Sequence, residues 1–220
     1  NNHRWTRRYC CYQKQYTRGA SLEMLRVALT GGIGTGKSTA SKILNELGSF
    51  IFDADKEAKN ILKNNETIQS ELIAEFGTDI MSGDEKIDNN KLARIAFQDQ
   101  DHQLKLNSII HPYVFQEIDK NFEDALKNGT YDIFVIDAAL IYESGADTHM
   151  DYVIVITALL KVRMERALQR ETLTRDEILK RIALQWPEEE KIALADFVIH
   201  NDGTEEELRG SITDIYNQLA

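Results

Sequence analysis

Short apolar runs alternate with longer amphipathic segments along this 220-residue chain. Five of the runs predict buried strands, over residues 25–30, 49–52, 131–136, 152–156 and 197–199. Between and after them, helical patterns cover 36–47, 54–62, 66–76, 90–97, 101–126, 159–194 and 204–219. The fifth helical pattern contains His111-Pro112, where we expect an interruption. Alternating strands and helices predict a three-layer α/β fold with a five-stranded parallel sheet.

Two helical blocks in this pattern contain no strand. They cover about residues 66–126 and 162–194. In α/β enzymes such insertions tend to lie over the carboxyl edge of the sheet, where ligands bind. We therefore expect a single P-loop domain over 24–220, with a helical substrate-binding insertion in the first block and a helical lid in the second.

Charge divides the chain into two unequal parts. Residues 1–23 carry five basic side chains, one acidic side chain and both cysteines, whereas the other 197 residues carry 21 basic and 35 acidic side chains. We expect the basic leader to be non-native or disordered. The acidic body argues against nucleic-acid binding, and its lack of cysteine excludes a disulfide scaffold. No apolar run is long enough to span a membrane, so we expect a cytoplasmic protein, monomeric or weakly homo-oligomeric.

A phosphate-binding motif follows the first predicted strand. Residues 31–38 read GGIGTGKS and match G-x-x-x-x-G-K-[ST] between a strand and a helix. Glycines let backbone N–H groups approach phosphate oxygens, Lys37 supplies a positive charge, and the Ser38 hydroxyl is suited to bind Mg²⁺. The sequence therefore predicts a bound nucleotide with Mg²⁺, held by Gly32, Gly34, Thr35, Gly36, Lys37, Ser38 and Thr39; for a kinase the nucleotide is ATP.

The motif does not by itself identify the phosphoryl acceptor, because GTPases, ATPase motors and small-molecule kinases share it. The guanine motif N-K-x-D is absent, since Asn90-Lys91 is followed by Leu92 and Ala93, and no D-x-x-G segment occurs. This disfavours a GTPase. A motor, a kinase and a nucleotide-dependent binding module remain open.

Acidic residues follow two of the predicted strands. Asp53 and Asp55 close the second strand, and a carboxylate there could activate an acceptor hydroxyl or merely cap the next helix. Asp137 ends the third strand, where a Walker-B carboxylate would lie, or it only caps a turn.

Five of the arginines fall between residues 163 and 181. Arg163, Arg166 and Arg170 have the spacing i, i+3, i+7, which predicts that they share one helix face. Such a face could belong to a lid that closes over the transferred phosphoryl group, or it could simply be solvated.

Four segments together resemble the dephospho-CoA kinase family: residues 31–39, Asp53-Ala54-Asp55-Lys56, Ile110-His111-Pro112 and residues 195–199. The resemblance runs from about residue 24 to the C-terminus. It implies that ATP phosphorylates the ribose 3′-hydroxyl of 3′-dephospho-CoA, giving CoA and ADP in the last step of coenzyme A biosynthesis. ATP and 3′-dephospho-CoA would then be its partners. Another nucleotide or small-metabolite kinase, or a non-catalytic nucleotide-binding regulatory module, is the alternative.

The resemblance also implies roles for individual residues. Asp55 would be the general base, His111 and Asp137 would lie on the acceptor side, and Arg166 and Arg170 would belong to the lid. Arg170 and Lys37 would join Asp55 in catalysis. Ala139 and Tyr142 stand where the family usually has proline and phenylalanine, which leaves the shape of the acceptor wall open.

Overall fold

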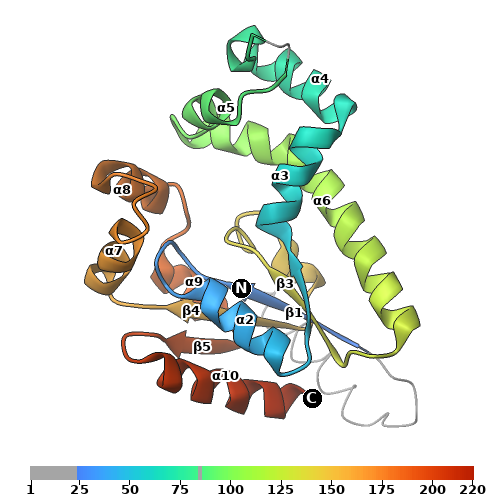
Figure 1. Ribbon diagram of the computed structural model, residues 1–220, viewed down its shortest axis with the longest axis vertical. Coiled ribbons are helices and arrows are strands. Elements are labelled where there is room, and N and C mark those ends of the chain that lie inside the picture. Colours follow the sequence, from blue (N-terminus) through green and yellow to red (C-terminus); the bar gives the residue numbers. More distant parts are fainter. Residues whose placement is uncertain (1–23, 84–85) are drawn as a thin grey trace.

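A five-stranded, fully parallel sheet forms the centre of the molecule (Figure 1). The computed structural model describes residues 24–83 and 86–220, so the prediction for the leader lies outside the described residues. The strands are β1 (Leu25–Thr30), β2 (Phe50–Asp53), β3 (Ile133–Asp137), β4 (Tyr152–Thr157) and β5 (Phe197–His200), in the order β2-β3-β1-β4-β5. The predicted fold class is confirmed.

Helices cover both faces of the sheet (Figure 1). One face packs against α2 (Lys37–Glu46) and α10 (Glu205–Leu219), and the other against α3 (Ala54–Asn64), α6 (Gln100–Asn128) and α9 (Glu188–Leu194). Strand residues alternate between these two cores: Val27 and Leu29 of β1 face α2, whereas Ala28 between them faces the α6 side. Burial on both faces explains why the strands read as continuous apolar runs.

Two helical lobes extend from the carboxyl side of the sheet (Figure 1). The first contains α4 (Glu66–Phe76), a 3₁₀ turn η1 (Thr78–Ile80), α5 (Asn89–Ala96) and the first half of α6. The second contains α7 (Leu160–Leu168) and α8 (Arg175–Ala183), and a further 3₁₀ turn, η2 (Ala146–His149), precedes β4. Both helical blocks predicted from the sequence therefore exist, each without a regular strand among its described residues.

The expected interruption at His111-Pro112 is wrong, because α6 runs through Pro112 without a break. A proline inside a helix removes one backbone hydrogen bond and usually bends or ends the helix. Here Leu106, Ile110, Val114 and Ile118 recur every fourth residue and are buried on both sides of the proline. This continuous apolar face packs into the core and stabilises the helix across the lost hydrogen bond.

The single helical stretch expected over 159–194 is three separate helices. The first, α7, ends at Leu168, and Glu171 has a left-handed φ of 52°. Thr174 then begins α8 with a capping box in which its side chain and that of Glu177 bond reciprocally. Arg170 lies beyond the end of α7, so the prediction that Arg163, Arg166 and Arg170 share one helix face is wrong.

Candidate active site

The phosphate-loop motif joins β1 to α2 at the carboxyl edge of the sheet (Figure 1). Gly34 and Gly36 have φ values of 79° and 96°, a left-handed conformation that favours glycine. Gly36 is also the N-cap of α2, and its carbonyl accepts the N–H of Ala40 at 3.1 Å. The loop therefore ends at a helix N-terminus, where free N–H groups and the helix dipole favour an anion.

Thr35 lies in this loop with its side chain turned inward. It is fully buried, and its hydroxyl donates to the carbonyl of Gly32 at 2.9 Å. Ser38 is exposed at the start of α2, and Thr39 is partly exposed beside it. The Thr35 hydroxyl thus supports the loop, whereas that of Ser38 faces solvent at the helix N-terminus.

Lys37 lies between two carboxylates that follow it by 18 and 100 positions in the sequence. Its Nζ atom is 2.5 Å from Oδ1 of Asp137 and 3.0 Å from Oδ2 of Asp55. The register of the strands explains why these residues lie together, because Asp137 of β3 is aligned with Leu29 of β1 and with Asp53 of β2. Lys37 of the phosphate-loop motif, Asp55 and Asp137 are therefore brought together at one sheet edge.

Burial and ion pairing shift the pKa values of Lys37 and Asp137 in opposite directions. Burial lowers the pKa of Lys37, but Asp55 and Asp137 raise it more, so its pKa lies above the ordinary value of 10.5. Burial raises the pKa of Asp137 above its ordinary value, while Lys37 and a hydrogen bond with Ser41 partly oppose this. Lys37 is consequently charged at neutral pH.

Asp53 and Asp55 have different roles in the structure. Asp53 is the N-cap of α3, where its Oδ1 accepts the backbone N–H of Lys56 at 2.8 Å. Asp55 is nearly half exposed, and besides Lys37 its carboxylate contacts the N–H of Ala139 at 3.4 Å. Asp53 provides the helix cap, whereas Asp55 faces Lys37 of the phosphate-loop motif. A proline at position 139 would lack this N–H donor.

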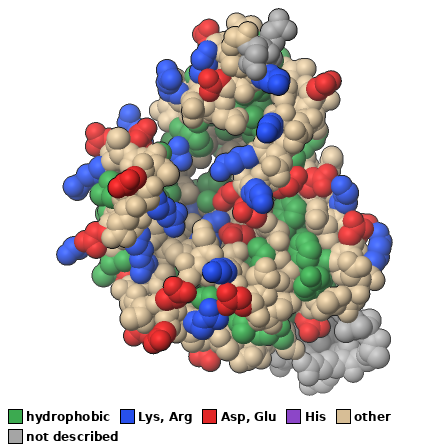
Figure 2. Space-filling model, viewed as in Figure 1, with side chains coloured by type: hydrophobic (Ala, Val, Ile, Leu, Met, Phe, Trp, Pro, Cys, Tyr) green, Lys and Arg blue, Asp and Glu red, His purple; other side chains and the backbone are tan. Residues whose placement is uncertain are grey.

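The three arginines predicted to belong to a lid occupy three different environments. Arg163 is buried, with only 4% of its side chain exposed. Arg166 donates to the carbonyl of Asn201 at 2.8 Å, and Arg170 is exposed after the end of α7. Figure 2 shows Lys and Arg side chains along the lobe of α7 and α8, beside a hollow that separates this lobe from the insertion. The two lobes also meet where Arg181 lies 5.5 Å from the ring centre of Phe97.

His111 lies within α6 and is partly buried. Its ring centre is 6.0 Å from that of Phe115, and burial lowers the pKa of His111 below its ordinary value of 6.5. Among the described contacts, none joins His111 to Lys37, Asp55 or Asp137. The structure therefore brings together Lys37, Asp55 and Asp137, but it does not bring His111 into contact with them.

Several residues that support the site were not predicted. Asn201 is buried at the end of β5 and donates to the carbonyl of Thr35 at 2.8 Å, so it anchors the phosphate loop. Lys191 is fully buried on α9 and forms an ion pair of 2.7 Å with Glu143, which also accepts the N–H of Trp186. Asn201 could have been found from the sequence, because it is a polar residue directly after a strand. The burial of Lys191 has no such local signal.

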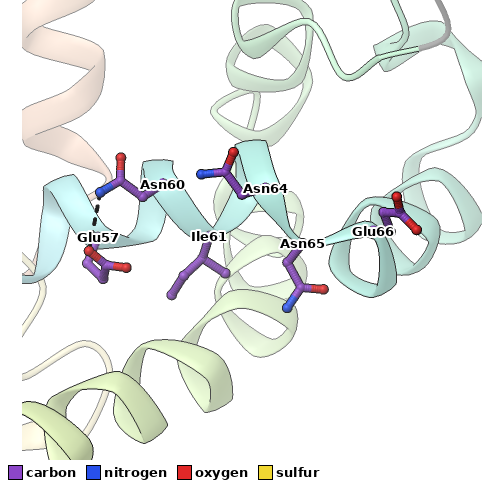
Figure 3. Close-up of a pocket in the computed structure, with 6 residues that line it drawn as sticks. All are labelled: Glu57, Asn60, Ile61, Asn64, Asn65 and Glu66. Carbon is purple, nitrogen blue, oxygen red and sulfur yellow. Dashed lines mark hydrogen bonds between the residues drawn. The ribbon is translucent and has the colours of Figure 1, made fainter.

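A surface hollow of about 440 Å³ lies along α3 (Figure 3). It is lined by Glu57, Asn60, Ile61, Asn64, Asn65 and Glu66, and Glu57 bonds to Asn60 at 3.2 Å. Successive helix residues are rotated by about 100°, so Glu57 points to nearly the opposite side of α3 from Asp55. This hollow is therefore separate from the cluster around Lys37.

Oxygen donors suited to Mg²⁺ are present beside the phosphate loop. The Ser38 hydroxyl is exposed, and the carboxylates of Asp55 and Asp137 lie within 3.0 Å of Lys37 Nζ. Among the described residues, no group of three or more His, Cys, Asp or Glu could hold a metal ion by itself. This set fits an ion that enters with nucleotide phosphates better than a resident metal.

No helix among the described residues has the length and apolar character to cross a membrane.

A family model and individual relatives all match this chain to dephospho-CoA kinases. The family model for dephospho-CoA kinase, CoaE, matches residues 25–207. A dephospho-CoA kinase of Geobacillus kaustophilus is 37% identical over 194 residues, which cover 88% of this chain and 96% of the relative. One from Carboxydothermus hydrogenoformans is 40% identical over 189 residues, covering 86% and 91%.

Solved structures similar to this chain include a dephospho-CoA kinase. A dephospho-CoA kinase from Campylobacter jejuni has a TM-score of 0.63 at 28% identity, over 88% of this chain and 96% of the other. A Thermus thermophilus protein reaches 0.74 at 28% identity, over 90% and 99%. A shikimate kinase from Acinetobacter baumannii, at 12% identity and 0.50, covers 89% and 92% and shares only the fold. With its phosphate loop, its paired acids and relatives matched almost end to end, the chain belongs to the dephospho-CoA kinase family.

Proposed function

We propose that this protein transfers the terminal phosphoryl group of ATP to the ribose 3′-hydroxyl of 3′-dephospho-CoA. The products are CoA and ADP, and the reaction is the last step of coenzyme A biosynthesis. One observation carries the mechanism: Asp55 lies 3.0 Å from Lys37 Nζ. An acid suited to an acceptor hydroxyl thus adjoins the lysine of the phosphate loop.

The proposed chemistry divides between these two residues. Asp55 accepts the proton of the 3′-hydroxyl while the hydroxyl oxygen attacks the γ-phosphorus of ATP. The bond between the γ-phosphorus and the bridging oxygen of the β-phosphate breaks, and ADP leaves. Lys37 stabilises the charge that develops on the transferred group and on ADP. Asp137 holds Lys37 from the other side, at 2.5 Å. Ser38 together with the nearby carboxylates would hold Mg²⁺, which would neutralise phosphate charge when bound with ATP.

The two helical lobes supply binding and closure in this proposal. The insertion, about residues 66–126, binds the acceptor, and partly buried His111 lies in this block. The segment at about 162–194 acts as the lid. Arg170 is exposed and carries no described ion pair, so it is available to the phosphoryl group. Arg166 is tied to the carbonyl of Asn201 and would act from that position beside the nucleotide.

The decisive experiment measures ADP formation by purified protein with Mg-ATP and single acceptors. The panel contains 3′-dephospho-CoA, AMP, adenosine and shikimate. We expect turnover with 3′-dephospho-CoA well above the ATP-only background. Turnover with AMP or shikimate but not with 3′-dephospho-CoA would favour another small-metabolite kinase. The absence of turnover with every acceptor, alongside measurable ATP binding, would favour a regulatory module.

Other properties belong to the same proposal. We infer that Mg²⁺ is required, which chelation with EDTA and readdition of Mg²⁺ would test. We also infer a cytoplasmic enzyme that is monomeric or weakly homo-oligomeric. Light scattering of the purified protein would measure the oligomeric state.

A further inference from the structure

A buried ion pair lies behind the phosphate loop, on the side of α7 and α9. Nη1 of Arg163 is 3.2 Å from Oε1 of Glu188, and these side chains are only 4% and 19% exposed. Nε of Arg163 donates to the backbone carbonyl of Ile33, in the middle of the loop, at 3.0 Å. One guanidinium thus joins α9 to the loop that is expected to bind the nucleotide phosphates.

Two glycines of the loop lie directly against this pair. Gly32 and Gly34 occupy positions that the phosphate-loop motif leaves unspecified. A Cβ atom at Gly32 would lie 2.6 Å from Oε1 of Glu188 and would collide with the guanidinium of Arg163. At Gly34 it would collide with the backbone of Arg163. The absence of side chains here lets the loop pack on the ion pair.

The charge of Arg163 also matters for an anionic ligand. Helix α9 begins with Glu188, Glu189 and Glu190, and Glu188 lies against Gly32 of the loop. Oε2 of Glu188 is buried and has no hydrogen-bond partner among the described residues. Arg163 provides the positive charge that compensates this carboxylate, which would otherwise repel bound phosphates in a poorly solvated site.

We infer that Arg163 and Glu188 are positioning residues for the phosphate loop. They act through Ile33 and Gly32 and hold the loop in the shape that binds nucleotide, while Arg163 compensates the nearby anion. The pair also connects the nucleotide site to α7 and α9, the first and last helices of the proposed lid. The inference rests on the nucleotide-binding part of the proposed function and is independent of the acceptor.

The test separates positioning from a purely structural role. In Arg163→Met/Glu188→Gln both charges are removed together, so no uncompensated buried ion remains, but the donor to Ile33 is lost. We expect the thermal midpoint to stay within a few degrees of wild type, while calorimetry shows ADP binding weakened by roughly tenfold or more. The KM for 3′-dephospho-CoA should change by less than about twofold, since only the nucleotide side is affected.

A second variant keeps the inference testable if the double variant does not fold. Arg163→Lys retains the charge beside Glu188. Its single ammonium group cannot reproduce the geometry with which the guanidinium contacts both Glu188 and the carbonyl of Ile33. We expect it to fold and to weaken ADP binding by at least about threefold. Arg209→Gln is the control, because it breaks an exposed ion pair of 2.7 Å with Glu46 far from the ion pair behind the loop. It should leave ADP affinity unchanged.

ADP affinity equal to that of wild type in the folded double variant, or in Arg163→Lys, would overturn the inference. Loss of ADP affinity in Arg209→Gln to the same degree would also overturn it. Failure of the proposed function gives a different result, because wild type would then bind ADP without phosphorylating 3′-dephospho-CoA.

Discussion

Lys37 and Asp137 are 100 positions apart in the chain, yet Nζ of one lies 2.5 Å from Oδ1 of the other. The contact forms because β1 and β3 are neighbours and both end at the same edge of the sheet. Lys37 begins α2 directly after the phosphate loop, and Asp137 is the last residue of β3. The parallel sheet therefore places Lys37, the lysine of the phosphate-loop motif, beside a carboxylate from a neighbouring strand.

Lys37→Ala should reduce turnover by at least about a hundredfold, because it removes the cation that we propose stabilises the transferred phosphoryl group. Steady-state ADP formation with 3′-dephospho-CoA measures the effect. Lys42→Ala is the matched control, since Lys42 is an exposed lysine on the same helix and should leave turnover unchanged. Turnover equally reduced in both variants would contradict the proposed role of Lys37.

Asp55→Asn should lower kcat by roughly 10²–10⁴-fold while ATP still binds, because the amide cannot accept the proton of the hydroxyl. Asp53→Asn, two residues away, should retain most activity, since asparagine is as good an N-cap as aspartate. Rapid-quench assays of the two purified variants, with ATP affinity from calorimetry, make the comparison. A normal kcat in Asp55→Asn would show that another group is the base.

The stability of the protein should depend on pH through His111. Burial holds the folded-state pKa of His111 below its ordinary value of 6.5. Between the folded pKa and 6.5 the unfolded chain binds more protons at His111, so the contribution of His111 to the free energy of unfolding rises with pH and levels off above about 6.5.

The measurement is a series of urea unfolding curves from pH 5 to 8. In His111→Gln the part of this rise that His111 contributes should be absent. His102→Gln serves as a control, because His102 is more than a third exposed and pairs with Asp99 at the surface. An unchanged pH dependence in His111→Gln would show that its burial is not coupled to stability.

Lys191→Met should destabilise the fold by about 3–5 kcal/mol, because it leaves the buried carboxylate of Glu143 without its counterion. Neutralising both partners in Glu143→Gln/Lys191→Met should recover much of this loss, since no uncompensated ion is then buried. Chemical denaturation measures both values. Equal destabilisation in the single and double variants would indicate that packing, and not charge, is responsible.

Local sequence patterns determined much of the fold and part of the site. The strand over 25–30, the glycine-rich motif and the helix over 66–76 are specified by neighbouring residues. The structure has the strand and the helix with these same bounds. Such features depend on hydrophobic periodicity and on turn chemistry, which act over a few residues. The same local signals predicted candidate acids at the ends of two strands.

Only the tertiary structure decided which of these residues meet. The choice of Asp53 as the cap and Asp55 as the partner of Lys37, and the burial of Arg163 against Ile33, could not be obtained from spacing. Nor could the helix through Pro112 be predicted, because packing of its apolar face outweighs the lost hydrogen bond. These outcomes depend on strand order and on packing between separate elements, as in the contact between Arg163 and Ile33, which are 130 positions apart, whereas sequence periodicity reports only on near neighbours.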